Sequence, residues 1–356
     1  MLPEDPNPSF YGKQKGERFM NQPKTAEAAL KDVFADDFKI GAAVSSGTIQ
    51  TQEELLKRHF NSMTAENEMK FENIHPAEDV YAFDESDAIV DFARRHGMAV
   101  RGHTLVWHNQ TGDWLFQDGD GRPAGKEVLL ERLRSHIETV VGRYKGDIYA
   151  WDVVNEAVAD EGGELLRPSK WLDIAGPGFI SKAFEFAHEA DPNARLFYND
   201  YNESHPHKRD KIHALVKSLL EQGVPIHGIG LQAHWNIFDP SLDDIRAAIE
   251  KYASLGLELQ LTELDVSVFR FDDRRTDLAE PEPGMLERQA EVYEAVFRLL
   301  KEYRGTVSAV TFWGAADDYT WLDDFPVRGR KNWPFLFDER HRPKPAYDRV
   351  ARLAGK

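Results

Sequence analysis

The feature that most constrains the fold is a regular alternation of short apolar segments with longer helical patterns, from about residue 38 to the end. Strands are predicted over Phe38–Val44, Asn61–Glu66, Met98–Thr104, Asp147–Val154, Arg195–Asp200, Gly228–Gln232, Leu257–Glu263 and Val307–Trp313. Helices are predicted over Thr51–Phe60, Glu85–His96, Lys126–Tyr144, Gly178–Ala190, Lys208–Gln222, Leu242–Leu255 and Met285–Tyr303, with a last one after Pro345. This order predicts an α/β protein with a single (β/α)8 barrel, because the alternative, an open doubly wound sheet, normally has fewer strands.

The chain shows no low-complexity linker that would divide it into two domains. We expect an N-terminal tail or leader over residues 1–25 and one catalytic domain over residues 26–356. The first twenty residues contain no apolar run that would form the core of a signal peptide, and no stretch reaches the length of a membrane helix. The sequence therefore predicts a cytoplasmic protein, or a secreted one if a signal peptide was removed.

Composition excludes several classes of partner. The formal net charge is −17, with 44 basic and 61 acidic side chains, so the surface field repels phosphate backbones and anionic lipids. Nucleic acid and membrane are therefore not expected partners. There is no cysteine, which excludes disulfides, thiolate metal sites and cysteine nucleophiles. These properties fit a neutral substrate; an oligomer is possible, but nothing indicates one.

Polar and aromatic side chains recur at the C-terminal ends of seven consecutive predicted strands, or just beyond them. Unpaired carboxylates are costly to desolvate, so such residues are unusual within apolar runs. In a barrel these strand ends share one face, where active sites lie. We therefore predict one pocket, lined by Glu66, Asn67, Lys70, His103, Trp107, Gln110, Asn155, Glu156, Tyr201, Asn202, Gln232, His234, Glu263, Asp265, Trp313 and Trp321.

Two glutamates in this set suggest glycosidic cleavage. Glu156 and Glu263 end the fourth and seventh predicted strands, which lie across the barrel from each other. Glycoside hydrolysis needs two carboxyl groups on either side of a sugar ring, one protonated and one ionised. A histidine bridging Glu263 and Asp265 would hold Glu263 ionised, and His234 is placed for that role. We therefore assign Glu263 as nucleophile and Glu156 as general acid/base, about 5–5.5 Å apart if the anomeric configuration is retained.

The other pocket residues favour a carbohydrate ligand. Trp107, Trp313 and Trp321 offer indole faces for stacking on the C–H faces of sugars, and amides beside them would bind hydroxyls. A nucleotide pocket would need a Gly-rich loop and basic groups, which this pocket lacks. His103 and His108 do not have the spacing of metal ligands on one helical face, so no metal or cofactor is expected.

The motifs WDVVNEA, TELD, GHTLVWH and TFWG, in this order, together resemble glycoside hydrolase family 10, from about Phe34 to the end. The chain is most similar to intracellular members of the family, which lack a signal peptide and a binding module. The resemblance implies a retaining endo-β-1,4-xylanase that acts on xylan and xylo-oligosaccharides, with short soluble oligosaccharides favoured. It implies that Gln110, Tyr201 and Asn202 lie on the leaving-group side. It also implies that the glycone subsites are lined by Glu66, Asn67, Lys70, His103, Trp107, Asn155, Gln232, His234, Trp313 and Trp321.

Two other functions stay open at this point. A β-1,4-glucanase or mannanase would use the same two carboxylates, and differs from a xylanase in one hydroxymethyl group per sugar. A non-catalytic sugar-binding barrel is the other alternative, although such proteins usually lose one of the carboxylates. The basic cluster Val327–Lys331 is expected to be solvated surface. The alternative hypothesis is that Arg328 contacts acidic branches of the substrate.

Overall fold

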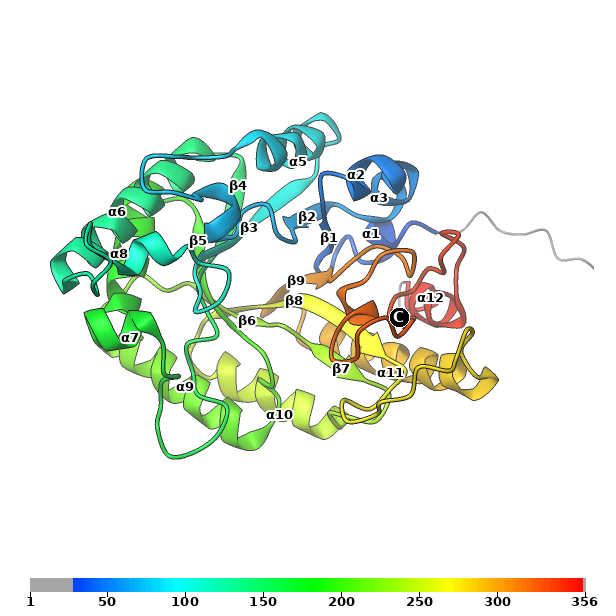
Figure 1. Ribbon diagram of the computed structural model, residues 1–356. Coiled ribbons are helices and arrows are strands. Elements are labelled where there is room, and N and C mark those ends of the chain that lie inside the picture. Colours follow the sequence, from blue (N-terminus) through cyan, green and yellow to red (C-terminus); the bar gives the residue numbers. More distant parts are fainter. Residues whose placement is uncertain (1–27, 355–356) are drawn as a thin grey trace, which may run out of the picture.

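The computed structural model describes residues 28–354, which form a closed (β/α)8 barrel (Figure 1). Eight parallel strands make the ring: β1 (Lys39–Val44), β2 (Ser62–Ala65), β3 (Ala99–Val106), β4 (Ile148–Asn155), β5 (Arg195–Asp200), β6 (Gly228–Leu231), β8 (Glu258–Ser267) and β9 (Val307–Phe312). The pairings of β1 with β9 and of β6 with β8 close it. A short strand, β7 (His234–Asn236), follows β6 and pairs with the end of β8. The predicted barrel is thus confirmed, while the predicted tail over residues 1–25 lies outside the described residues.

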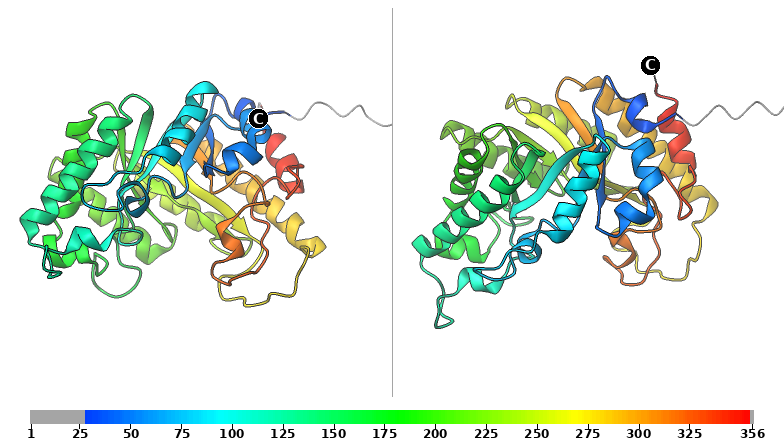
Figure 2. Two further views of the ribbon diagram at one scale, coloured as in Figure 1. Left: turned by 45° about the horizontal axis from the view of Figure 1, so that its top comes forward. Right: turned by 90° about the horizontal axis from the view of Figure 1, so that it is seen from above.

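Helices surround the barrel, as the two further views show (Figure 2). They are α1 (Leu30–Val33), α2 (Thr48–Thr51), α3 (Glu53–His59), α4 (Phe71–Ile74), α5 (Asp84–Arg95), α6 (Lys126–Arg143), α7 (Lys170–Ala175), α8 (Phe179–Ala190), α9 (Pro206–Glu221), α10 (Leu242–Ala253), α11 (Pro283–Glu302) and α12 (Pro345–Ala351). Each long helix turns an apolar face to the strands. In α11 this face includes Tyr293, Phe297 and Leu300, which are fully buried at helical spacing. Within residues 28–354, no helix is both long and apolar enough to cross a membrane.

Several predicted elements have different bounds in the structure, and two of these differences have a clear cause. The helix predicted over Thr51–Phe60 corresponds to α3, which begins at Glu53, and a separate short helix, α2, ends at Thr51. Gln52 lies between them with its side chain buried, and it donates a hydrogen bond to Asp318 (2.7 Å). The strand predicted over Leu257–Glu263 continues to Ser267, because β7 pairs with its last residues. Both differences come from contacts between segments distant in the chain, which local periodicity does not contain.

The barrel interior contains a buried charged pair directly below the strand ends. The Arg101 guanidinium on β3 donates two hydrogen bonds to the Asp152 carboxylate on β4 (2.7 and 2.9 Å), and its Nε donates to Gln260 on β8 (2.6 Å). Asp152 also bonds Nδ1 of His103 (2.9 Å). Burial opposes ionisation of Asp152, but the charge of Arg101 and the bonds from His103 and Arg101 hold its pKa below the usual value. The pair thus links β3, β4 and β8 beneath the pocket.

We expect Asp152→Asn to destabilise the fold strongly, because it leaves the buried Arg101 cation without its counter-charge. Breaking one partner of a buried pair costs about 3–5 kcal/mol of the free energy of unfolding. Urea denaturation followed by tryptophan fluorescence measures this. Arg94→Ala, which removes an exposed guanidinium paired with Asp147, is the control and should change stability little. A loss for Asp152→Asn as small as the control's would contradict the expectation.

Candidate active site

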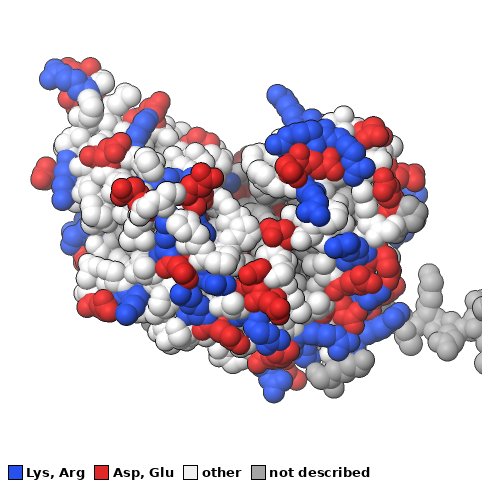
Figure 3. All heavy atoms as spheres, turned by 90° about the horizontal axis from the view of Figure 1, so that it is seen from below, with Lys and Arg blue, Asp and Glu red and all other residues white. Residues whose placement is uncertain are grey.

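A cleft of about 800 Å³ opens at the C-terminal ends of the barrel strands. Figure 3 shows the molecule from one side, with a notch between two raised parts of the surface and mostly uncharged side chains around it. Every residue that the sequence predicts for the site lines this cleft: Glu66, Asn67, Lys70, His103, Trp107, Gln110, Asn155, Glu156, Tyr201, Asn202, Gln232, His234, Glu263, Asp265, Trp313 and Trp321. Seven strand ends therefore meet at one cavity.

Glu263 lies within β8, where the register with β9 shifts between Leu261 and Leu264. Its Oε2 bonds Nε2 of His234 (3.1 Å), whose Nδ1 bonds Asp265 (2.8 Å). Burial alone would lower the pKa of His234, but the charges of Asp265 and Glu263 and the bonds to them raise it to about 10. Burial likewise opposes ionisation of Glu263, yet the hydrogen bond and charge of His234 hold its pKa below the usual value. The structure thus supplies an ionised carboxylate, held by an imidazolium.

Glu156 follows the last residue of β4 and has a left-handed backbone, with φ +57°. Its N–H donates to the carbonyl of Asn199 (2.9 Å). Its carboxyl group receives three hydrogen bonds: Trp107 Nε1 donates to Oε2 (2.8 Å), while Gln232 Nε2 (3.0 Å) and Asn155 Nδ2 (3.3 Å) donate to Oε1. Its side chain is 11% exposed at the cleft. This carboxyl is therefore fixed, yet open to a ligand.

Amides connect the two glutamates across the cleft. Asn199 Nδ2 donates to Glu263 Oε1 (2.7 Å) and to Asn155 Oδ1 (2.9 Å), and Asn155 Oδ1 also accepts from Gln232 Nε2 (3.2 Å). Since Gln232 in turn donates to Glu156, one continuous network joins both carboxyl groups. Two carboxyl groups at one cavity, one of them with a lowered pKa, can perform nucleophilic and acid/base chemistry on a bound acetal.

A second polar group lies at the ends of β2 and β3. Lys70 Nζ donates to Asn67 Oδ1 (3.0 Å) and to Gln110 Oε1 (2.9 Å), and lies 5.0 Å from the centre of the Trp107 ring. Burial raises the pKa of Glu66 to about 7, against the charge of Lys70. Gln110, predicted for the leaving-group side, is thus placed with residues predicted for the glycone side. The reason is that the segment after β3 packs against the first turn of α4, where Glu72 N–H donates to the Gln110 carbonyl (2.9 Å).

The tryptophans lie at the cleft, with contacts that the sequence does not reveal. Trp107 donates to Glu156, as described, and Trp321 Nε1 donates to Asp265 (2.9 Å). Trp313 meets His103 and His234 edge-on. Two of the three indoles therefore orient carboxylates besides lining the cavity.

The basic cluster Val327–Lys331, which the sequence predicts to be solvated surface, is solvated only in part. Arg330 is 2% exposed, lies 4.3 Å above the Phe269 ring and donates to the carbonyl of Asp273 (2.6 Å). Lys331 pairs with Asp323 (3.0 Å) and with Glu339. These side chains hold the last long loop in place. Arg328 alone of the three cations is exposed.

Several polar residues at the site have no role in the predictions from the sequence, although His108 and Asn199 lie at or just after predicted strand ends. His108 and Arg167 line the cleft near Glu156, and Asn199 bonds Glu263 without reaching the surface. Asn199 is next to the last residue of the predicted strand Arg195–Asp200, so its position carries a usable signal. Arg167 lies in a loop with no periodicity and gave none. Within residues 28–354, no three His, Cys, Asp or Glu side chains form a group that would hold a metal ion.

Comparison with known proteins identifies the family. The sequence model described as glycosyl hydrolase family 10 matches residues 29–353. The chain belongs to glycoside hydrolase family 10. This family member is 62% identical to an endo-1,4-β-xylanase of Geobacillus stearothermophilus, over 91% of this chain and 98% of that protein. It is 58% identical to endo-1,4-β-xylanase B of Paenibacillus barcinonensis, over 90% of this chain and 97% of that protein. A crystal structure of a Paenibacillus barcinonensis xylanase with a conduramine derivative matches this fold with a TM-score of 0.91 at 57% identity, covering 92% and 99% of the two chains.

Proposed function

We propose that this family 10 glycoside hydrolase is a retaining endo-1,4-β-xylanase, with Glu263 as nucleophile and Glu156 as general acid/base. The observation that carries the proposal is the different environment of two carboxyl groups in one cleft. Glu263 has a lowered pKa and is held by His234, whereas Glu156 faces the cavity with indole and amide donors. The xylanases named above, alike over nearly their whole length, support the choice of substrate.

The mechanism is a double displacement. Glu263 attacks the anomeric carbon while the Glu156 carboxyl gives its proton to the leaving oxygen, so that the glycosidic bond breaks and a glycosyl ester forms on Glu263. A water molecule then enters on the leaving-group side and passes a proton to Glu156. Its oxygen bonds to the anomeric carbon and releases Glu263. Each step inverts the anomeric carbon, so the product keeps the β configuration.

The remaining cleft residues are proposed to bind the xylan or xylo-oligosaccharide chain. Lys70, Asn67, Gln110 and Glu66 present donors and acceptors for sugar hydroxyls on the glycone side. Tyr201 and Asn202, after β5, line the same cleft and would contact the leaving sugar. The rings of Trp313 and Trp321 would stack on the glycone. No step of this mechanism uses a metal or an organic cofactor.

The stereochemical course tests the proposal directly. Proton NMR during digestion of a soluble xylo-oligosaccharide should show the β-anomer of the product first, with the α-anomer appearing later by mutarotation. Early appearance of the α-anomer would show a single displacement and reject Glu263 as a covalent nucleophile.

We expect an aryl xylobioside to be cleaved faster than the matching aryl cellobioside. The two differ by a hydroxymethyl group on each sugar. In a pocket that fits xylose, the lining side chains must move to admit that group. One such group changes kcat/KM by roughly tenfold or more. Initial rates at low substrate concentration measure this ratio. Faster cleavage of the cellobioside would favour the β-1,4-glucanase alternative, while leaving the assignment of the two glutamates unchanged.

A further inference from the structure

The loop that follows β4 returns to the strand end from which it starts. Its backbone forms an antiparallel hairpin, in which Ala159 N–H donates to the Leu165 carbonyl (3.0 Å) and Arg167 N–H donates to the Ala157 carbonyl (2.8 Å). The hairpin therefore places Arg167 beside Glu156, although the two are 11 positions apart in the chain.

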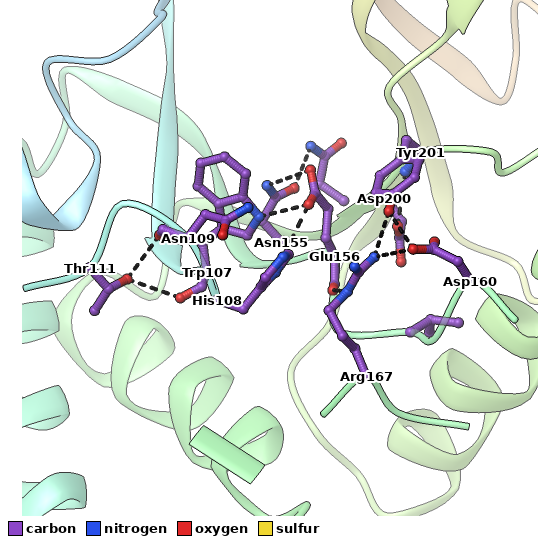
Figure 4. A network of polar contacts seen from close by, with 12 residues as sticks. Trp107, His108, Asn109, Thr111, Asn155, Glu156, Asp160, Arg167, Asp200 and Tyr201 are labelled. Atoms are coloured by element: carbon purple, nitrogen blue, oxygen red, sulfur yellow. Dashed lines mark hydrogen bonds and ion pairs between the residues drawn. The ribbon is translucent and has the colours of Figure 1, made fainter. Parts of the chain in front are cut away.

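The Arg167 guanidinium binds three oxygen atoms around this strand end (Figure 4). Its Nε donates to the main-chain carbonyl of Glu156 (3.1 Å), and Nη2 donates to the Tyr201 hydroxyl (2.7 Å) and pairs with the Asp160 carboxylate (2.9 Å). The Tyr201 hydroxyl donates in turn to the same carboxylate (2.5 Å). A planar guanidinium holds several acceptors in fixed directions, which a lysine ammonium on a flexible stem does not.

The Asp160 carboxylate, which pairs with Arg167, is itself held in place by a buried lysine. Asp160 accepts a hydrogen bond from Lys208 on α9 (2.7 Å), and Lys208 is 2% exposed. Lys208 also donates to the Val158 carbonyl (2.9 Å) and pairs with the buried Asp200 at the end of β5 (3.1 Å). The anchor of Arg167 is thus tied to a helix and a strand of the barrel, rather than to a free loop.

The main chain of Glu156 needs such support. A residue with a β-carbon is disfavoured at φ +57°, so this conformation persists only where the surroundings determine it. That backbone directs the carboxyl group toward Trp107 and Gln232 in the cleft. One side of the Glu156 peptide is held by Asn199, whose carbonyl accepts from its N–H, and the other by Arg167.

We propose that Arg167 is a positioning residue for Glu156. By binding the Glu156 carbonyl and the Tyr201 hydroxyl together, it fixes the backbone from which the acid/base carboxyl reaches the leaving oxygen. The inference rests on the proposed function, because it takes Glu156 as the acid/base. Arg167 therefore influences the proton transfer from Glu156 to the leaving oxygen. Its loss should lower kcat/KM for substrates whose leaving group needs a proton, and should change kcat/KM little for the others.

The test is Arg167→Lys, which keeps the positive charge and removes the guanidinium fork. We compare kcat/KM for phenyl xylobioside, a poor leaving group, with that for dinitrophenyl xylobioside, a good one. Both place an aryl ring in the leaving-group site. A misplaced acid should lower kcat/KM by about 30-fold for the phenyl substrate, since small displacements cost up to 10²-fold and proton donation contributes about 10²–10⁴-fold. For the dinitrophenyl substrate we expect a change of less than about threefold, because that leaving group departs without a proton.

Arg143→Lys is the matched control. Arg143 on α6 also binds a carboxylate through two guanidinium nitrogens, because its Nε (2.9 Å) and Nη2 both donate to Asp87. This pair lies far from the cleft. The Arg143→Lys variant should therefore cleave both substrates like the parent. Equal losses on both substrates for Arg167→Lys, or no loss on either, would overturn the proposal. If Arg167→Lys does not fold, Asp160→Asn, which weakens the hold on the same guanidinium, is compared in the same way, with the same outcomes. Failure of the parent enzyme to cleave either xylobioside would instead reject the proposed function.

Discussion

Glu263→Ala should reduce kcat on xylo-oligosaccharides by roughly 10⁵-fold, the scale of loss seen when a hydrolase loses its covalent nucleophile. The alanine leaves His234 and Asn199 in place around a vacant position, so substrate binding should survive while attack on the anomeric carbon fails. Steady-state kinetics on xylotriose measures the loss. Glu258→Ala, at the other end of β8 and bound to Arg195, is the matched control and should retain the activity of the parent.

Adding azide as an external nucleophile shows whether Glu263→Ala has lost only its nucleophile or has also lost its structure. In Glu263→Ala, azide can enter the vacant position and attack dinitrophenyl xylobioside once, which inverts the anomeric carbon. We expect renewed release of dinitrophenol and an α-xylobiosyl azide, identified by NMR. A β-azide from this variant would mean that a second carboxylate forms the covalent intermediate, and the assignment of Glu263 would be wrong.

The main features of the fold and site followed from the sequence because they depend on strands. The ends of eight parallel strands meet on one face, so residues such as Glu66, Asn155 and Trp313 were predicted to share a cavity from their place after a strand alone. The bridge from Glu263 through His234 to Asp265 also follows, because strand order sets these residues side by side. The structure confirms that these residues line one cleft.

What the sequence did not reveal depends on contacts between irregular segments. Arg167 reaches Glu156 through a hairpin whose residues show neither helical nor strand periodicity. Arg330 looks like a surface cation in its local sequence, yet Phe269 and Asp273 from the loop after β8 cover it. Gln110 belongs with Lys70 because two loops pack together at that end of the cleft. Such pairings involve residues far apart in sequence, and composition carries no trace of them.

Glu156→Ala should separate the two halves of the mechanism more clearly than any other substitution. Protonation by Glu156 matters for a sugar leaving group, so kcat/KM on xylotriose should fall by about 10³-fold or more. Dinitrophenyl xylobioside needs no proton for the first step, so its kcat/KM should change little. Its kcat should nevertheless fall, because water in the second step lacks its base and the glycosyl ester on Glu263 accumulates.

Azide again decides the assignment, now with the opposite stereochemistry. In Glu156→Ala the anion can enter where the acid/base stood and attack the glycosyl ester on Glu263 without losing a proton. Two displacements then retain the configuration, and we expect a β-xylobiosyl azide together with a higher kcat for dinitrophenyl xylobioside. The two variants thus give azides of opposite anomeric configuration only if Glu263 and Glu156 lie on opposite faces of the same sugar. Parent-like kinetics on xylotriose for Glu156→Ala would instead favour another proton donor in the cleft, such as Glu66, whose pKa burial raises to about 7.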